Sequence, residues 1–501
     1  MSNTAAGLAK GVLALQVVSV NLLPDCGTNR GINSTNEHVS GLRPQSDSIG
    51  FGHARSATGA RTPRNDTSCS PRPFNPKPLM KTTDYAVCVA LDWSDQQHAF
   101  ALQFAAANSK ETGMITGSPE GFHGWLEELH ARCPNQRGAV ILEAGRNSVM
   151  HVLVEHEWLD IFPIHPATCA RFRTAFTPSG AKDDVPDAEV LLTLLLRHRD
   201  QLHQLPRDTA QTRELAALVV ARRHAVDRRT QLGHQLRTTL KSYFPQALQL
   251  IGEAFEHPMA LDFLSRWPDL VSLKKARAAT LRTFYYLHRA RRPELIEQRI
   301  KLIAEARALT PDPAVVVPAV MQVQMFVELL RVQEKHIVRF DEQIAELFAA
   351  HPAAAFFRQL PGAGANLAPR LLVAFGDDLS RYPTPSSLQK YAGVAPVREC
   401  SGKKSWTHWR WHAPIFLRQS LVEWAGQTVV FCPWAKAYYW QHRRAGKAHQ
   451  SILRALAFKW IRILWRCWQA HEPYDDARYV AALRRRNSPL IALIESQDAA
   501  A

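Results

Sequence analysis

Four acidic residues stand at the ends of predicted strands and at the start of a predicted helix, and this placement constrains the fold more than any other feature. Asp92 closes the apolar run YAVCVAL, and Glu143 closes the run AVIL. Both runs are short and rich in residues that buried strands favour. Asp184 and Asp187 open the helical pattern DVPDAEVLLTLLLRH, in which positions i and i+3 share a face. We therefore predict an α/β region whose carboxylates meet at one edge of a sheet.

Such a set of carboxylates points to metal-dependent chemistry on phosphodiesters. Carboxylates gathered closely raise one another's pKa unless a cation neutralises them. Oxygen ligands suit Mg²⁺ or Mn²⁺, and two such ions about 3.5–4 Å apart can stabilise both oxygens of a phosphoryl transfer. Asp92, Glu143, Asp184 and Asp187 are therefore candidate metal ligands and catalytic residues. The alternative is that each is an ordinary surface acid, because Asp also favours strand ends and first helical turns.

The same residues carry a family resemblance that extends over most of residues 80 to 470. The segments ALDWSDQQHAFAL, ILEAG and KDDVPDA resemble the DEDD transposases and recombinases of insertion-sequence family 110. Farther along, FFRQLPGAGANLAPRLLVAFGD and LQKYAGVAPVRECSGKK resemble the C-terminal transposase domain of that family. The resemblance implies an RNase H-like (RuvC-like) catalytic domain that binds Mg²⁺ or Mn²⁺, followed by a second domain with a nucleophilic serine.

In the family pattern that serine precedes a glycine, a few residues after Gly-x-x-Pro, and the matching residue is Ser401. The resemblance implies that Ser401 attacks DNA in a composite site with the metal-bound acids. The alternative is that Ser401 and Gly402 only begin a turn, as Ser-Gly pairs usually do. The chain also departs from the family. Asp183 replaces a small polar residue, and the basic stretch after the serine is replaced by Trp406, His408, Trp409, Arg410 and Trp411.

The resemblance implies the transposase or site-specific recombinase of a mobile element, cutting and rejoining DNA as a homo-oligomer, dimer or tetramer, in the bacterial cytoplasm at the nucleoid. For some members it implies a structured guide RNA that pairs with target and donor DNA. Two other functions stay open: a RuvC-like structure-selective nuclease that uses metal-activated water, and a non-catalytic nucleic-acid-binding regulator. A covalent protein–DNA adduct would distinguish the serine-dependent recombinase from the nuclease. The regulator predicts that Asp92→Ala and Glu143→Ala leave the biological effect intact.

The charge of the chain favours a polyanionic partner. Its 61 Lys and Arg residues exceed its 45 Asp and Glu residues, which gives a net charge of +16, and such cations supply most non-specific nucleic-acid affinity. Residues 406 to 468 hold nine of the 13 tryptophans, interleaved with cations, as in sites that stack unpaired bases. Trp460 and Trp465 have helical spacing typical of a core. The candidate nucleic-acid contacts are Arg410, Arg443, Arg444 and Lys447.

The cysteines and the N-terminal segment indicate the cellular compartment and the start of the folded chain. Eight cysteines without a CxxC pair argue against a zinc site and a disulfide scaffold, and a reducing cytoplasm is expected. No stretch reaches the roughly 18 uninterrupted apolar residues that span a bilayer. Residues 24–79 are polar and lack periodicity. We predict that the natural start is Met80 and that residues 1–79 are a non-folding extension; removing their 8 basic and 4 acidic residues leaves +12.

The patterns predict a division into an α/β domain at 80–200, a helical coiled-coil region at 201–350, a mostly α-helical transposase domain at 351–475 and a tail at 476–501. In the first domain we expect a hairpin near 98–104, a helix at 121–133 and a strand at 159–164. Two apolar series mark long helices, which pair either within one chain or between two copies: Leu215, Val219, Val226, Leu232, Leu236, Leu240, and Val323, Leu330, Ile337, Ile344. The turn LPGAG at 360–364 resembles a helix-hairpin-helix turn that approaches a phosphate, or is a plain connector.

Overall fold

The computed structural model of the chain describes residues 85–107, 109–143, 148–176, 184–378, 381–402, 404–411 and 413–498. The side chains of residues 175, 176, 184, 497 and 498 are outside this description. The predictions made for residues 1–79, for Met80 as the start and for Asp183 therefore lie outside the described residues.

The N-terminal part of the described chain is built on a mixed five-stranded sheet with the order β3-β2-β1-β4-β5. β1 pairs antiparallel with β2, which pairs antiparallel with β3, whereas β1 to β4 and β4 to β5 are parallel. The strand at 159–164 and the hairpin near 98–104 are confirmed, and β3 was not anticipated. The strands are β1 (Val87–Asp92), β2 (Gln97–Phe104), β3 (Glu111–Thr116), β4 (Gly138–Glu143) and β5 (Leu159–Ile164).

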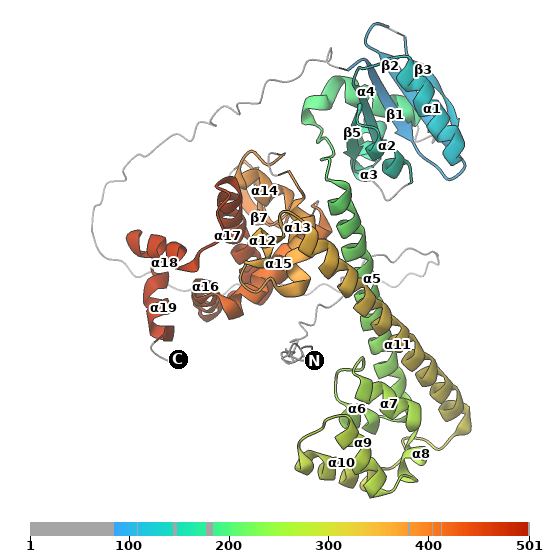
Figure 1. Cartoon of the computed structure of the whole chain (residues 1–501), viewed down its shortest axis with the longest axis vertical. Helices are drawn as coiled ribbons and strands as arrows, with labels where there is room; N and C mark the ends of the chain where they lie inside the picture. Colours follow the sequence, from blue (N-terminus) through green and yellow to red (C-terminus); the bar gives the residue numbers. More distant parts are fainter. Residues whose placement is uncertain are drawn as a thin grey trace, which may run out of the picture. The chain divides into compact units, whose positions relative to one another are not determined.

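Helices cover both faces of this sheet because successive side chains of a strand point to opposite faces. In β1, Val87, Val89 and Leu91 pack in one core with α1 (Pro119–Ala131) and α2 (Ser148–Glu155). The alternate residues Cys88 and Ala90 pack in a second core with α3 (Pro166–Phe176) and α4 (Asp184–His198). The helix predicted from the acidic motif is confirmed as α4. Figure 1 shows these helices around the sheet.

Two long helices, α5 (Ala210–Tyr243) and α11 (Pro313–Ala350), lie antiparallel along each other (Figure 1). Gln211 Nε2 donates to the carbonyl of Leu347, Arg222 pairs with Asp341, and Arg229 Nη1 lies 2.8 Å from Glu334 Oε1. The apolar series thus pair within the chain. Five short helices connect α5 to α11 in the sequence and form a core with these two long helices. They are α6 (Gln246–Ile251), α7 (Pro258–Arg266), α8 (Leu270–Lys274), α9 (Ala278–Leu287) and α10 (Pro293–Glu305).

α11 is apolar on more than the face that meets α5. By length and composition it is the one helix in the described part of the chain that could cross a membrane, although 28% of its most apolar window is buried within the chain. A second face exposes apolar side chains spaced by four, four, four and three residues. These are Val317, Met321, Met325, Leu329 and Val332.

The C-terminal part is mostly helical and has its own core. Two short strands, β6 (Val397–Ser401) and β7 (Lys404–His408), form an antiparallel hairpin. Residues 476–501 were expected to be a tail, but residues 476–498 form two helices whose Leu483, Leu490 and Ile494 join the core. The helices are α12 (Ala354–Arg358), α13 (Gly364–Phe375), α14 (Pro385–Tyr391), α15 (Ile415–Phe431), α16 (Pro433–Arg444), α17 (His449–Gln469), α18 (Asp476–Arg485) and α19 (Leu490–Asp498).

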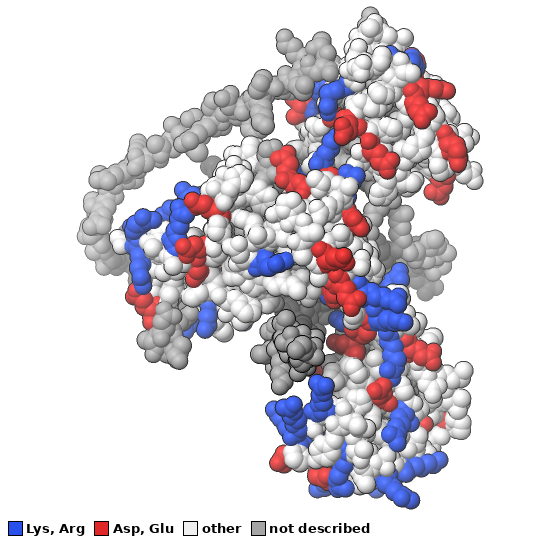
Figure 2. Space-filling model, viewed as in Figure 1, with Lys and Arg blue, Asp and Glu red and all other residues white. Residues whose placement is uncertain are grey.

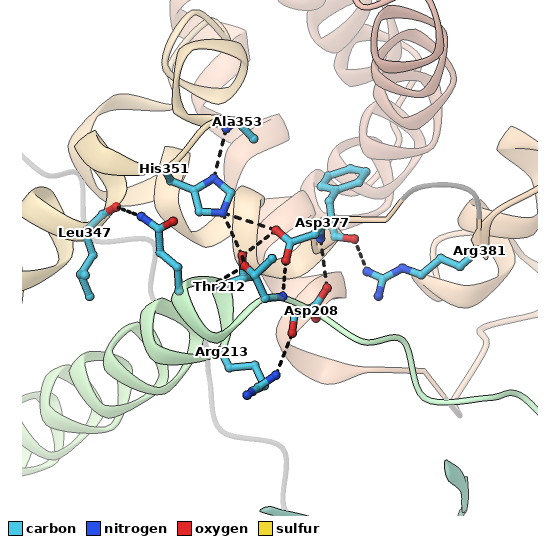
Figure 3. A network of polar contacts seen from close by, with 11 residues as sticks. Asp208, Thr212, Arg213, Leu347, His351, Ala353, Asp377 and Arg381 are labelled. Carbon is cyan, nitrogen blue, oxygen red and sulfur yellow. Dashed lines mark hydrogen bonds and ion pairs between the residues drawn. The ribbon is translucent and has the colours of Figure 1, made fainter. Parts of the chain in front are cut away.

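A buried polar network fixes the start of α5 against the end of α11 and the residues after α13 (Figure 3). Thr212 Oγ1 donates to Asp377 Oδ1 at 2.6 Å, and the Thr209 backbone N–H donates to Asp377 Oδ2 at 2.5 Å. His351 Nδ1 accepts from the Ala353 backbone N–H, which assigns a ring proton to Nε2, 2.8 Å from Thr212 Oγ1. Burial alone raises the pKa of Asp377, but these hydrogen bonds hold the pKa below its usual value.

The turn at 360–364 serves packing in this structure. Gly362 has a φ of +70°, and a Cβ there would lie 2.9 Å from the ring of Phe431 and 3.0 Å from Gln427 on α15. Trp424 of α15 donates its Nε1–H to the carbonyl of Pro361 at 2.9 Å. The glycine therefore allows close approach to α15, which matches the connector interpretation of this turn.

The prediction that Trp460 belongs to the core can be tested by mutation. Trp460 is fully buried and donates to Thr428 Oγ1 at 3.0 Å, whereas Trp465 is half-buried against the same core. Trp460→Ala should lower the free energy of unfolding by about 3–5 kcal/mol because it opens a large cavity. The exposed control, Trp440→Ala, should change it by no more than about 0.5 kcal/mol. Guanidinium unfolding measures both, and equal losses would contradict the assignment.

Candidate active site at the ends of the parallel strands

Asp92 and Glu143 lie at the same edge of the sheet. They are the last residues of β1 and β4, which run parallel with Leu91 opposite Leu142. Parallel neighbours lie about 4.8 Å apart. The alternation of side chains places Asp92 on the face of Ala90, and Glu143 on the face of Ile141, where α3 and α4 cover the sheet.

Asp187 reaches this face from the first turn of α4. Its side chain is 3% exposed, and its Oδ1 lies 2.6 Å from Nε of Arg173 on α3. A buried carboxylate needs such a counter-charge, because desolvation disfavours an isolated ion. Asp184 begins the same helix, but its side chain is outside the described residues.

The thiol of Cys169 links Glu143 with Asp187. Cys169 lies on α3, is 2% exposed and hydrogen-bonds to Glu143. Burial, followed by the charge of Glu143 and the hydrogen bond to it, raises the pKa of this thiol to about 12, and the charge of Asp187 acts in the same direction. Both acids therefore act on one buried group, which is neutral at physiological pH.

Cys169 and Arg173 were missed in the sequence analysis. They stand four residues apart on α3 and so share one helical face. The available signal was their position directly after β5, the neighbour of β4 in the sheet. A helix that follows this strand returns along the face where Glu143 points.

The chemistry of the donors fits a hard divalent cation, since all of them are carboxylates. Among the described residues, however, no group of three or more His, Cys, Asp or Glu side chains is arranged to hold a metal ion. In the present arrangement the positive charge beside Asp187 comes from Arg173. Asp92, Glu143 and Asp187 therefore remain predicted ligands on one face of the sheet.

Asp160, a buried acid near the opposite end of the strands, has a structural role. Asp160, 4% exposed near the start of β5, accepts from Tyr85 Oη at 2.7 Å and from Gln204 Nε2 at 2.7 Å, and it pairs with Arg137. Burial and the bond to Asp160 raise the pKa of Tyr85. Three side chains from different segments thus satisfy Asp160, so its role is to hold the strand starts together.

Ser401 ends β6 at the tip of the exposed hairpin, opposite Lys404. The turn begins at Gly402, whose φ of +55° lies in the left-handed region that favours glycine. His408 pairs with Val397 at the other end of the ladder. Four steps of ~3.3 Å place it about 13 Å along the strand from Ser401, too far to take its proton.

The predicted nucleic-acid contacts lie in two places of the C-terminal part. Arg443, Arg444 and Lys447 are exposed at the end of α16 and just after it, where Arg443 Nη1 donates to the Lys447 carbonyl at 3.2 Å. Arg410 is half-buried after β7, and its carbonyl accepts from Arg418 Nη1 at 3.2 Å. Their role in nucleic-acid binding stays a prediction.

Comparison with known proteins identifies the class. A family model for IS110 elements, described as "Transposase", matches residues 89–245, and one described as "Transposase IS116/IS110/IS902 family" matches residues 354–440. The "Mini-circle putative transposase for IS117" of Streptomyces coelicolor is 26% identical over 407 residues, 79% of this chain and 97% of that protein. The "Insertion element IS110 uncharacterized 43.6 kDa protein" of the same organism is 28% identical over 297 residues, 58% of this chain and 71% of that protein.

The "Insertion element IS900 uncharacterized 42 kDa protein" of Mycobacterium paratuberculosis is 26% identical over 241 residues, 47% of this chain and 59% of that protein. The two matched regions and these relatives define an insertion-element transposase, a protein that acts on DNA. The chain belongs to the IS110 family of transposases.

The hairpin that carries Ser401 should respond to pH. A hydrogen bond to the Trp409 carbonyl, together with Glu399 Oε1 at 2.7 Å, raises the pKa of His408 above 6.5. The ion pair is therefore complete below pH 6.5 and is lost as the pH rises through the folded-state pKa. NMR of labelled histidine rings, assigned with His408→Gln, should show a midpoint above 6.5 that falls in Glu399→Gln. A midpoint at or below 6.5 would contradict this pairing.

Proposed function

We propose that this transposase cuts and rejoins DNA at a composite site, with metal-binding acids on a RuvC-like domain and a nucleophilic serine on the C-terminal domain. The observation that supports the proposal is that Asp92 and Glu143 end adjacent parallel strands on the sheet face covered by α4, the helix that carries Asp187. The mixed sheet with helices on both faces supports an RNase H-like assignment for this domain.

In this proposal Asp92, Glu143, Asp184 and Asp187 hold Mg²⁺ or Mn²⁺. When bound, such an ion supplies a Lewis acid that stabilises negative charge on phosphate oxygens. Arg173 neutralises Asp187 when no metal is bound, which lowers the cost of keeping a buried carboxylate ionised. This contact holds the Asp187 side chain in place on the face where the metal would bind.

Ser401 is the proposed nucleophile. Its Oγ forms a bond to phosphorus while the bond to a deoxyribose oxygen breaks, and the displaced oxygen takes up a proton as the hydroxyl loses one. The resulting phosphoserine link conserves the energy of the phosphodiester for rejoining. The exposed tip of the β6–β7 hairpin supports this role, because a duplex can approach Ser401 there without displacing a core element.

We further propose that the protein acts as a homo-oligomer in the bacterial cytoplasm, at the nucleoid. The exposed face of α11, with Val317, Met321, Met325, Leu329 and Val332, supports self-association, because contiguous exposed apolar surface usually marks an interface. Arg410, Arg443, Arg444 and Lys447 are proposed contacts to phosphates. The proposal includes a guide RNA. Co-purification of a discrete RNA with the protein would support that part of it.

The serine role is tested by capturing covalent protein–DNA adducts. Ser401→Ala should abolish the adduct and strand exchange, because no other nucleophile replaces the hydroxyl. Ser405→Ala is a matched control on β7: its Oγ accepts from Arg398 Nε at 2.9 Å on the same exposed hairpin. This control should retain the adduct.

Other results of these experiments would support one of the two alternative functions. DNA cleavage without any adduct, unchanged in Ser401→Ala, would indicate a metal-dependent nuclease. A biological effect that persists in Asp92→Ala and Glu143→Ala would indicate a regulator. An adduct that survives in Ser401→Ala would refute the serine role.

A further inference from the structure

A groove with a large excess of positive charge lies between α17 and α18. Its cavity has a volume of about 890 Å³. Six cations line it against only two acids, Glu472 and Asp475. Figure 2 shows Lys and Arg side chains gathered over these two helices. The cations are Lys459, Arg462 and Arg466 on α17, and Arg478, Arg485 and Arg486 on α18 and its C-terminal cap.

Both acids of the groove are already engaged. Glu472 pairs with Arg478, and Asp475 accepts from the Arg478 backbone N–H at 3.2 Å as the cap of α18. For Arg462, Arg466, Arg485 and Arg486, all exposed, the part of the chain that the structure describes contains no ion pair. Like charges around one cavity repel each other, and an anionic ligand would remove this cost.

The floor of the groove is aromatic and rigid. Trp465 donates its Nε1–H to the Tyr382 carbonyl at 3.0 Å, and Tyr474 Oη donates to Asp476 Oδ1 at 2.7 Å. The ring of Tyr479 lies 4.8 Å from that of Trp434. Trp465, Tyr474 and Tyr479 are half-buried and line the groove, so ring surfaces held by these contacts lie beside exposed arginines. Positively charged grooves with aromatic rings are characteristic of sites for single nucleic-acid strands.

We propose that this groove binds a single nucleic-acid strand, with the guanidinium groups on its phosphates and the aromatic floor beside its bases. From Lys459 to Arg466 the cations extend seven residues along α17, or about 10 Å at 1.5 Å per residue. This length favours repeated phosphates over one anion. Guanidinium groups match phosphate geometry with two parallel hydrogen bonds. The site lies beyond the region matched by the family models, which ends at residue 440.

The binding test uses the full chain and fluorescently labelled 20-nucleotide oligo(U), oligo(dT) and a duplex of equal length. The groove variant is Arg462→Gln/Arg466→Gln/Arg486→Gln. We expect its affinity for the single strands to fall at least about tenfold at 100 mM salt, and the slope of log K against log salt to lose about two units, at ~0.7 per phosphate contact. Anisotropy titrations at several salt concentrations measure both quantities.

The matched control removes the same three charges from cations that already pair with acids: Arg282→Gln/Lys301→Gln/Arg484→Gln, whose partners are Glu297, Glu305 and Glu495. Its affinity should stay within about threefold of the parent, because paired cations release few counterions. An equal loss in both triple variants would overturn the proposal, since net charge alone would then explain it. A groove-variant loss larger for duplex than for single strands would also overturn it.

A third variant separates binding from folding. Arg462→Lys/Arg466→Lys/Arg486→Lys keeps the charges and should retain most of the affinity, and thermal unfolding of all three variants verifies the fold. A lysine variant that folds but binds as weakly as the glutamine variant would refute the electrostatic contact. Tighter binding of oligo(U) than of oligo(dT) would assign the strand as RNA, and the reverse order would assign it as DNA; both results support the site.

Discussion

The parallel pairing of β1 with β4 is the constraint on which the candidate site depends. It brings the ends of two strands, 51 positions apart in the sequence, to the same edge of the sheet, with Leu91 opposite Leu142. The alternation of side chains then turns Asp92 and Glu143 toward α4. A shift of the pairing by one residue would turn Glu143 to the other face and away from Asp187. The hydrophobic residues of both faces therefore also determine where the acids point.

Charged and polar contacts account for the side chains that gather at this edge of the sheet. Burial, together with Glu143 and Asp187, raises the pKa of the Cys169 thiol, and Arg173 supplies a positive charge beside Asp187. Asp160, near the other end of the strands, is buried with three hydrogen-bonding side chains around it. Asp160 is thus committed to structure at that end of the strands.

The fold of the first domain could be predicted from the sequence because its signals are local. The apolar runs, the acid-headed helix and the strand at 159–164 lie where periodicity placed them. β3 escaped because its residues are mostly exposed, with only Ile115 buried, and α3 escaped because it has a weak apolar stripe. The partner of α11 could not be predicted, because an apolar heptad looks the same whether its partner is in the same chain or in another.

The candidate site was predicted in part. Strand ends and helix starts placed three of the acids, since the periods of strands and helices fix which side each residue takes. Cys169 and Arg173 were missed, because their contacts with Glu143 and Asp187 form when α3 packs beside β4 and α4. The groove of α17 and α18 was missed for the same reason: its cations come from two helices, one of them in a segment expected to be a tail.

The central claim is that the acids at this edge together bind a divalent cation. Titration of the full chain with Mn²⁺, followed by the EPR signal of the free ion, tests it without requiring activity. We predict saturable binding that weakens about 10-fold or more in Asp92→Asn, Glu143→Gln and Asp187→Asn, and that is unchanged in Asp95→Asn, an exposed acid outside the set. Equal Mn²⁺ binding by the parent and all three site variants would contradict the account.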